Sequence, residues 1–210
     1  MMTKKLLSIV KGIYERSFPF IFRDKNGIWS SKIPDDLLIL SGSFNPLHEG
    51  HIMMMKVAEE ITLMNPVYEI SVLNVDKPAL PLENLIKRLK SFPFDAQILI
   101  TSSPRFNDKS ILFPGSKFLI GYDTAVRLLD SKYYSDFSHF NKGDIVLDAL
   151  EVINQNNCSF IVAGRIDNTN RFKSIGDLKI SNLFQHIFSE IPEEKFRLDI
   201  SSTEIRYYKQ

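Results

Sequence analysis

Residues 37–61 read LLILSGSFNPLHEGHIMMMKVAEEI, and the organisation that we expect for the whole chain starts from this stretch. It opens with the apolar run Leu37-Leu38-Ile39-Leu40, whose length and composition are typical of a buried strand. From Ile52 to Ile61 the apolar residues recur at helical spacing. The stretch therefore predicts a strand, a glycine-containing turn and the N-terminus of a helix.

Two histidines stand where this helix should begin. His48 and His51 are three residues apart, so they share one face of the first helical turn. That turn also presents N–H groups without intrahelical partners and the positive end of the helix dipole. Together with Gly42, which allows close approach, these groups are typical of a phosphate-binding site. The alternatives are a structural helix cap or half of a zinc site, whose other ligands would come from distant positions, namely His139, His186 and Cys158.

Two motifs resemble those of one enzyme superfamily. Residues 42–51, GSFNPLHEGH, match the pattern G-x-F-x-P-x-H-x-G-H of the nucleotidyltransferases with the HxGH motif. Residues 200–206, ISSTEIR, match the second motif of that superfamily, I-S-S-T-x-I-R. The resemblance extends from Leu37 to Arg206, which is most of the chain.

The second motif also has chemistry that its residue types indicate directly. Ser201 or Ser202 is suited to cap a short helix, and Thr203 adds another hydroxyl. Arg206 lies one turn further and can bind a phosphate through two parallel hydrogen bonds. A capped helix with a surface arginine is the alternative, but the pairing with the histidine motif favours phosphate binding.

The resemblance implies nucleotidyl transfer without a covalent intermediate. A phosphate oxygen of the acceptor attacks the α-phosphorus of a nucleoside triphosphate in line, and pyrophosphate leaves. His48 and His51 would contact the α- and β-phosphates, while Ser202, Thr203 and Arg206 would hold the β- and γ-phosphates. The backbone of Ser43 and Phe44 would lie over the nucleotide. Mg²⁺ is expected on the triphosphate oxygens and on water, so we predict no protein ligand for a metal ion.

Further segments resemble the branch that adenylates pyridine mononucleotides. Gly121-Tyr122-Asp123 matches its G-x-D, where Asp123 would bind a ribose hydroxyl or lie near the pyridine substituent. Lys77 and Arg88 are similar to a lysine and an arginine that meet the acceptor there. Gly164-Arg165 is similar to a pair near the nucleotide. The alternatives are a helix cap at Asp123 and solvated surface charge at Lys77 and Arg88.

The chain departs from that branch in one respect. The branch has a tryptophan soon after G-x-D that stacks on the pyridine ring, but residues 124–130, TAVRLLD, contain none. Trp29 lies far upstream. Tyr133, Tyr134 or Phe106 could stack instead, or these side chains could belong to the core.

Strands and helices alternate along the chain, and several of the strands are continuously apolar. We predict strands at 37–40, 68–74, 96–101, 117–121, 159–163 and 196–198, and helices at 3–17, 52–61, 82–90, 124–129, 144–154 and 178–189. This pattern favours an α/β fold, a Rossmann-like doubly wound parallel sheet of about five to six strands with helices on both faces. Ligands then bind beyond the carboxyl ends of the strands, where strand order reverses. We divide the chain into an N-terminal helical extension, 1–36, and a nucleotidyltransferase domain, 37–210.

The composition limits the classes of protein and the cellular compartments that we expect for the chain. The net charge of +1 offers no basic field for nucleic acid. One cysteine excludes an internal disulfide framework and fits a reducing compartment. Residues 4–11 hold too short an apolar run for a signal peptide, and no stretch approaches a membrane span. We therefore expect a cytoplasmic protein that binds neither nucleic acid nor membrane, and an oligomer is possible.

These observations lead to one principal hypothesis and two alternatives. The first is an adenylyltransferase that joins ATP to nicotinamide or nicotinate mononucleotide, in NAD biosynthesis. The second keeps the reaction but takes phosphopantetheine, a flavin mononucleotide or a phosphorylated alcohol as the acceptor. The third is a nucleotide-binding protein without turnover.

Overall fold

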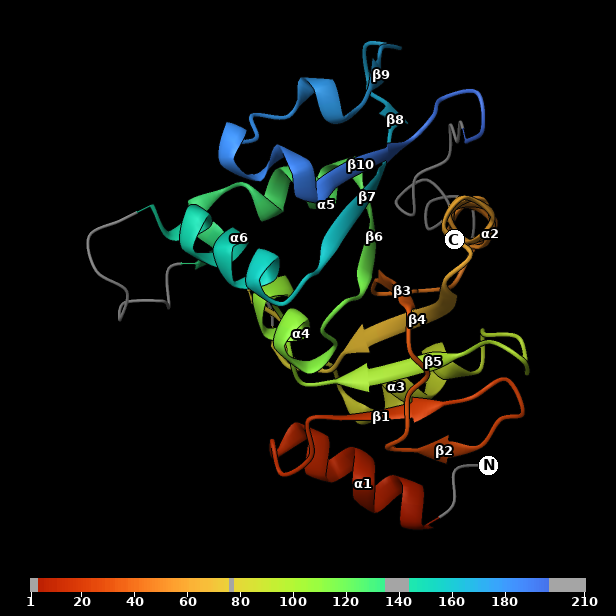
Figure 1. Ribbon diagram of the computed structural model, residues 1–210. Helices are drawn as coiled ribbons and strands as arrows, with labels where there is room; N and C mark the ends of the chain where they lie inside the picture. The colour runs from red at the N-terminus through yellow and green to blue at the C-terminus, as the bar shows by residue number, and fades with distance from the viewer. Residues whose placement is uncertain (1–3, 76–77, 135–143, 197–210) are drawn as a thin grey trace.

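The fold is described from a computed structural model, in which residues 4–75, 78–134 and 144–196 are placed (Figure 1). Its centre is an eight-stranded sheet with the order β10-β7-β6-β3-β4-β5-β1-β2. The strands are β1 (Phe20–Arg23), β2 (Trp29–Ser30), β3 (Leu37–Ser41), β4 (Asn65–Ser71), β5 (Ile98–Thr101), β6 (Lys117–Gly121), β7 (Ser159–Ala163) and β10 (Phe188–Ile191). A separate antiparallel pair joins β8 (Arg165–Ile166) to β9 (Phe172–Lys173).

The six strands from β10 to β5 are parallel, so their carboxyl ends lie along one edge of the sheet. Strand β3 pairs with β4 on one side and with β6 on the other. After β3 the chain therefore adds β4 and β5 on one side of this strand, and it then crosses back to add β6, β7 and β10 on the other side. The switch point of the sheet, near which ligands of such sheets bind, therefore lies at the carboxyl ends of β3 and β6.

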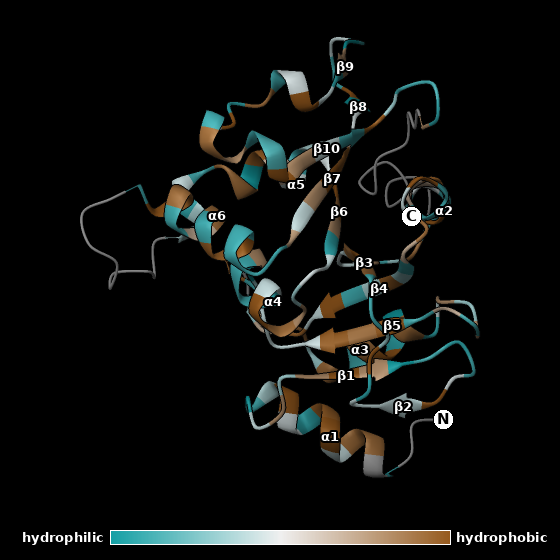
Figure 2. Cartoon of the chain, viewed as in Figure 1, coloured by the Kyte–Doolittle hydropathy of each residue, from teal (hydrophilic) through white to brown (hydrophobic). Residues whose placement is uncertain are grey.

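Helices cover both faces of the sheet, which explains why most positions of the central strands are buried and apolar. Along β3, Leu38 and Leu40 face one core cluster, and Leu37 and Ile39 face the other. The first face carries α1 (Lys4–Tyr14), α2 (Glu49–Thr62) and α3 (Leu82–Leu89). The second carries α4 (Phe106–Leu112), α5 (Tyr122–Leu128) and α6 (Ile145–Gln155), with the 3₁₀ turns η1 (Ser131–Tyr134), η2 (Ile175–Asp177) and η3 (Asn182–Ile187). Figure 2 shows the resulting brown strands, for example β1 and β5.

The predicted α/β, Rossmann-like fold is confirmed, but the strand count was too low. Two of the additional strands come from the segment that we described as a helical extension. Its helix is present as α1, yet residues 20–23 and 29–30 form β1 and β2, and β1 pairs antiparallel with β5. This pairing joins residues almost 80 positions apart, from Phe20–Arg23 to Ile98–Thr101, so no local pattern could indicate it.

The helix predicted at residues 178–189 is wrong. Residues 182–187 form the 3₁₀ turn η3, and residues 188–191 form β10, which pairs in parallel with β7 at the sheet edge. Helix α4 at 106–112 was not predicted. Of the last predicted strand, 196–198, only Phe196 is placed, and it is not in a strand. Among the placed residues, no helix has both the length and the apolar character needed to cross a bilayer.

Candidate active site at the switch point

The turn between β3 and α2 carries the first motif. β3 ends at Ser41, and α2 begins at Glu49 with His48 in extended conformation at the N-cap position. The backbone N–H of His51 donates to the carbonyl of His48 at 2.9 Å, which closes the first helical turn. His48 makes no side-chain hydrogen bond to the first N–H groups of the helix. The cap alternative therefore lacks the bond that would define it.

The two histidine rings are stacked on each other. Their centroids lie 3.7 Å apart with an interplanar angle of 29°. Burial lowers the pKa of His48, and burial together with the neighbouring His48 lowers the pKa of His51 to about 4. Both shifts favour the neutral form of the imidazole, which is a hydrogen-bonding group rather than a cation. Nδ1 of His51 is buried and has no hydrogen-bond partner among the placed residues.

Phe44 anchors the turn in the core. Its side chain is 1% exposed, and its ring meets those of His51, Tyr68 and Phe92 edge-on at 5.0, 5.5 and 5.2 Å. A Cβ added to Gly42 would lie 2.8 Å from this ring. The glycine therefore allows Phe44 to pack under the turn, and this packing fixes the ring of His51.

Helix α3 and the residues that follow it also hold the turn. Nη1 of Arg88 donates to the carbonyl of Ser43 at 2.8 Å, and Oγ of Ser91 accepts from the N–H of Leu47 at 3.4 Å. Two residues that the sequence assigned to different ligands, Ser43 and Arg88, thus touch each other. Arg88 is bound to the backbone rather than being a solvated surface charge.

The second part of the site lies at the end of the neighbouring strand. The last paired residues of β3 and β6 are Leu40 and Leu119, so Gly42 and Gly121 occupy equivalent positions two residues further on. Gly121 is the N-cap residue of α5, and no placed atom lies within 4 Å of a Cβ added there. Asp123, in the first turn of α5, forms an ion pair with Arg165. The helix-cap alternative for Asp123 is therefore wrong.

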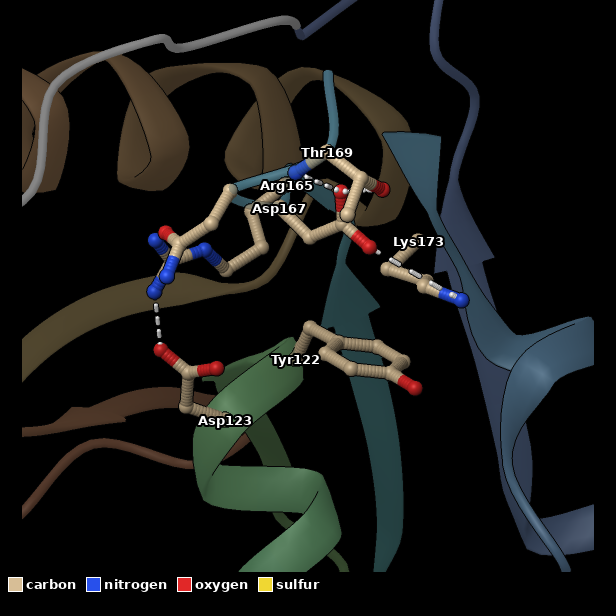
Figure 3. Close-up of a pocket in the computed structure, with 7 residues that line it drawn as sticks. Tyr122, Asp123, Arg165, Asp167, Thr169 and Lys173 are labelled. Atoms are coloured by element: carbon tan, nitrogen blue, oxygen red, sulfur yellow. Dashed lines mark hydrogen bonds and ion pairs between the residues drawn. The ribbon is translucent and has the colours of Figure 1, made fainter. Parts of the chain in front are cut away.

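The Asp123–Arg165 pair borders a cavity of about 400 Å³ (Figure 3). Tyr122 and Asp123 contribute from α5, and the β8–β9 hairpin faces them with Arg165, Asp167, Asn168, Thr169 and Lys173. Within the hairpin, Oδ1 of Asp167 accepts from the N–H and the hydroxyl of Thr169 at 2.8 and 2.6 Å. Of these hairpin residues, Arg165 was predicted from the sequence, whereas Asp167, Asn168, Thr169 and Lys173 were not, although the run DNTN at 167–170 is a typical turn signal.

The aromatic side chains that we considered for stacking lie elsewhere. Tyr134 is buried in the second core, where its hydroxyl donates to the carbonyl of Leu128 at 2.9 Å. Phe106 packs edge-on against Phe118 and Phe160. Tyr133 also packs against that core. Tyr122, which we did not consider, is the aromatic residue that lines the cavity.

Several candidates lie outside the residues that the structure describes. They are Lys77 and the second motif with Ser201, Ser202, Thr203 and Arg206. Their approach to the histidines stays a prediction. Among the placed residues no group of three or more His, Cys, Asp or Glu side chains could hold a metal ion. His186, one candidate zinc ligand, contacts Oδ1 of Asn154 instead.

Comparison with curated proteins gives a partial similarity. The chain is similar to a Schizosaccharomyces pombe protein named "Putative nicotinamide mononucleotide adenylyltransferase", with 29% identity over 114 residues. The match covers 48% of this chain and 45% of the yeast protein, so it spans less than half of either. No family model matches the chain. A distant relationship to the nucleotidyltransferases is what this similarity suggests.

Proposed function

We propose that the protein is an adenylyltransferase that transfers AMP from ATP to nicotinamide mononucleotide or nicotinate mononucleotide. The observation that carries the proposal is the stacked pair His48 and His51 at the start of α2, directly beyond β3 at the switch point. The name of the yeast relative supports the choice of acceptor. The cavity bordered by Asp123 and Arg165, with a volume of about 400 Å³, is our candidate for the binding site of the second ligand.

In the proposed reaction the triphosphate lies across the turn. The imidazole N–H groups of His48 and His51 donate to phosphate oxygens, and the first N–H groups of α2 add the field of the helix end. These neutral donors stabilise the charge that develops on the equatorial and leaving oxygens.

The acceptor's phosphate oxygen forms the new bond to the α-phosphorus while the bond to the β-phosphate oxygen breaks. Pyrophosphate takes the electron pair and leaves, so no residue of the protein becomes covalently modified. Mg²⁺ bound to the triphosphate oxygens would neutralise charge there. The protein then contributes positioning rather than acid–base chemistry.

The proposal is tested by incubating the protein with ATP, Mg²⁺ and each mononucleotide and measuring pyrophosphate release. We expect release with at least one of the two acceptors and a dinucleotide product by mass. Release only with phosphopantetheine, a flavin mononucleotide or a phosphorylated alcohol would replace the acceptor. If calorimetry shows ATP binding but no acceptor of the panel gives pyrophosphate release, the protein is a nucleotide-binding protein rather than an enzyme.

A further inference from the structure

A buried polar network lies under the start of the β3–α2 turn, on the sheet face opposite to α2. Glu69 of β4 is 1% exposed, and the side chain of Lys109 of α4 is 5% exposed. Nζ of Lys109 lies 2.9 Å from Oε2 of Glu69. The other carboxylate oxygen accepts a hydrogen bond from Oγ1 of Thr101 at 2.5 Å. Both charges are thus removed from water, which is costly unless each one is paired.

The network reaches the turn at two consecutive residues. Nζ of Lys109 donates to Oγ of Ser41 at 3.2 Å. The backbone N–H of Gly42 donates to the carbonyl of Glu69 at 3.0 Å. Glu69 therefore holds Gly42 through its backbone and Ser41 through Lys109. Figure 1 shows α4, the helix that contains Lys109, beside the arrowheads of β4 and β5.

The ammonium group also lies 4.9 Å from the ring centroid of Phe106, which restricts it further. Stability alone gives little reason for such an arrangement, because a well-packed apolar pair of similar volume is often as stable as a buried ion pair. What the charged pair adds here is directed hydrogen bonding from a rigid α4 to Ser41.

We propose that Lys109 and Glu69 are positioning residues that fix where the phosphate-binding turn leaves β3. They act through Ser41 and Gly42, while Phe44 and Arg88 hold the same turn from the opposite face. The network on one face of the sheet and these two residues on the other hold the same turn, an arrangement that we call the clamp. The effect on nucleotide binding rests on the proposed function, whereas the effect on the backbone of the turn does not.

The first test measures amide hydrogen exchange of residues 42–48 without ligand. Ser41→Ala removes the acceptor of Lys109 and leaves the buried ion pair intact. Lys109→Met removes the cation, and Glu69→Gln with Lys109→Met removes both charges if the single variant does not fold. We expect exchange in the turn to rise by about tenfold, as for the loss of one charge-assisted hydrogen bond.

Leu150→Ala is the matched control. Leu150 is fully buried in α6 on the same face, and its truncation lowers the melting temperature without touching the turn. We expect unchanged exchange in residues 42–48 for this variant. Lys109→Arg keeps the cation and should show exchange close to that of the wild type in the same residues. Wild-type exchange in the turn of Ser41→Ala and of the folded lysine variant would overturn the proposal.

The second test measures the dissociation constant of ATP with Mg²⁺ by calorimetry. We expect binding about tenfold weaker in Lys109→Met than in wild type, and unchanged binding in Leu150→Ala. Faster exchange in the turn together with an absence of ATP binding by wild type would support the clamp and overturn the proposed function. Weaker ATP binding with unchanged exchange in the turn would overturn the positioning role of Lys109 and Glu69 but not the proposed function.

Discussion

The two parts of the candidate site are built in opposite ways. The β3–α2 turn is packed from below by Phe44, held by Arg88 and Ser91, and linked to the Glu69–Lys109 pair. The Asp123–Arg165 cavity is open, and its ion pair joins side chains that are 57% and 36% exposed. A rigid turn suits a ligand part that is always the same, such as a triphosphate. An open cavity with exposed charges suits the part that differs between acceptors.

The largest effect is expected on the catalytic rate of a variant in the β3–α2 turn. His51→Ala should lower kcat by about 10²–10³-fold, because it removes a donor to charge that develops in the transition state. Pyrophosphate release measures the rate, and circular dichroism checks the fold. His186→Ala, which removes an exposed histidine of η3, is the control and should keep the wild-type rate. A folded His51→Ala variant with wild-type turnover would refute the assignment.

The pH dependence of stability should also come from the turn. Burial lowers the pKa of His51 from 6.5 in the unfolded chain to about 4, so the unfolded state binds more protons between these values. Stability is therefore present above pH 6.5 and falls as the pH drops towards 4, by at most about 3 kcal/mol. Urea unfolding from pH 7 to pH 4 measures this loss. His51→Asn should flatten the curve, and a variant with the wild-type slope would contradict the cause.

A pair of glycine substitutions sharpens the comparison. Gly42→Ala should destabilise the protein by about 1–3 kcal/mol, because the ring of Phe44 is enclosed by other rings and cannot move away. Gly121→Ala meets no placed atom and should change the free energy of unfolding by less than about 1 kcal/mol. Instead, we expect it to weaken nucleotide binding. Equal losses of stability in both variants would remove the distinction between the two parts.

The smallest effect on stability is expected at the exposed pair. Arg165→Met should change the free energy of unfolding by less than about 1 kcal/mol, yet raise the KM of the nucleotide or the acceptor several-fold. Lys132→Met, which breaks another exposed pair with Asp130, is the matched control and should leave KM unchanged. If both variants leave KM at the wild-type value, the cavity is not part of the site.

Local signals explain which features the sequence could predict. The strand, the glycine and the two histidines stand within 15 residues, so the turn and the parallel sheet were predicted correctly. Arg88 was also selected, although its contact with the carbonyl of Ser43 spans 45 residues and was not foreseen. Lys109 was missed because a lysine in a short polar helix normally points to solvent. Its burial depends on Glu69 and Ser41, which reach it only after the sheet has formed.

The first 36 residues have a consequence for how the molecule can be divided. β1 covers the side of β5 that would otherwise present free backbone groups, and α1 buries Val10 and Ile13 against the sheet. A fragment that starts at residue 37 would lose this cover and expose both a strand edge and an apolar surface. Such a fragment should self-associate rather than remain monodisperse in size-exclusion chromatography. The N-terminal segment is thus expected to protect the sheet from aggregation.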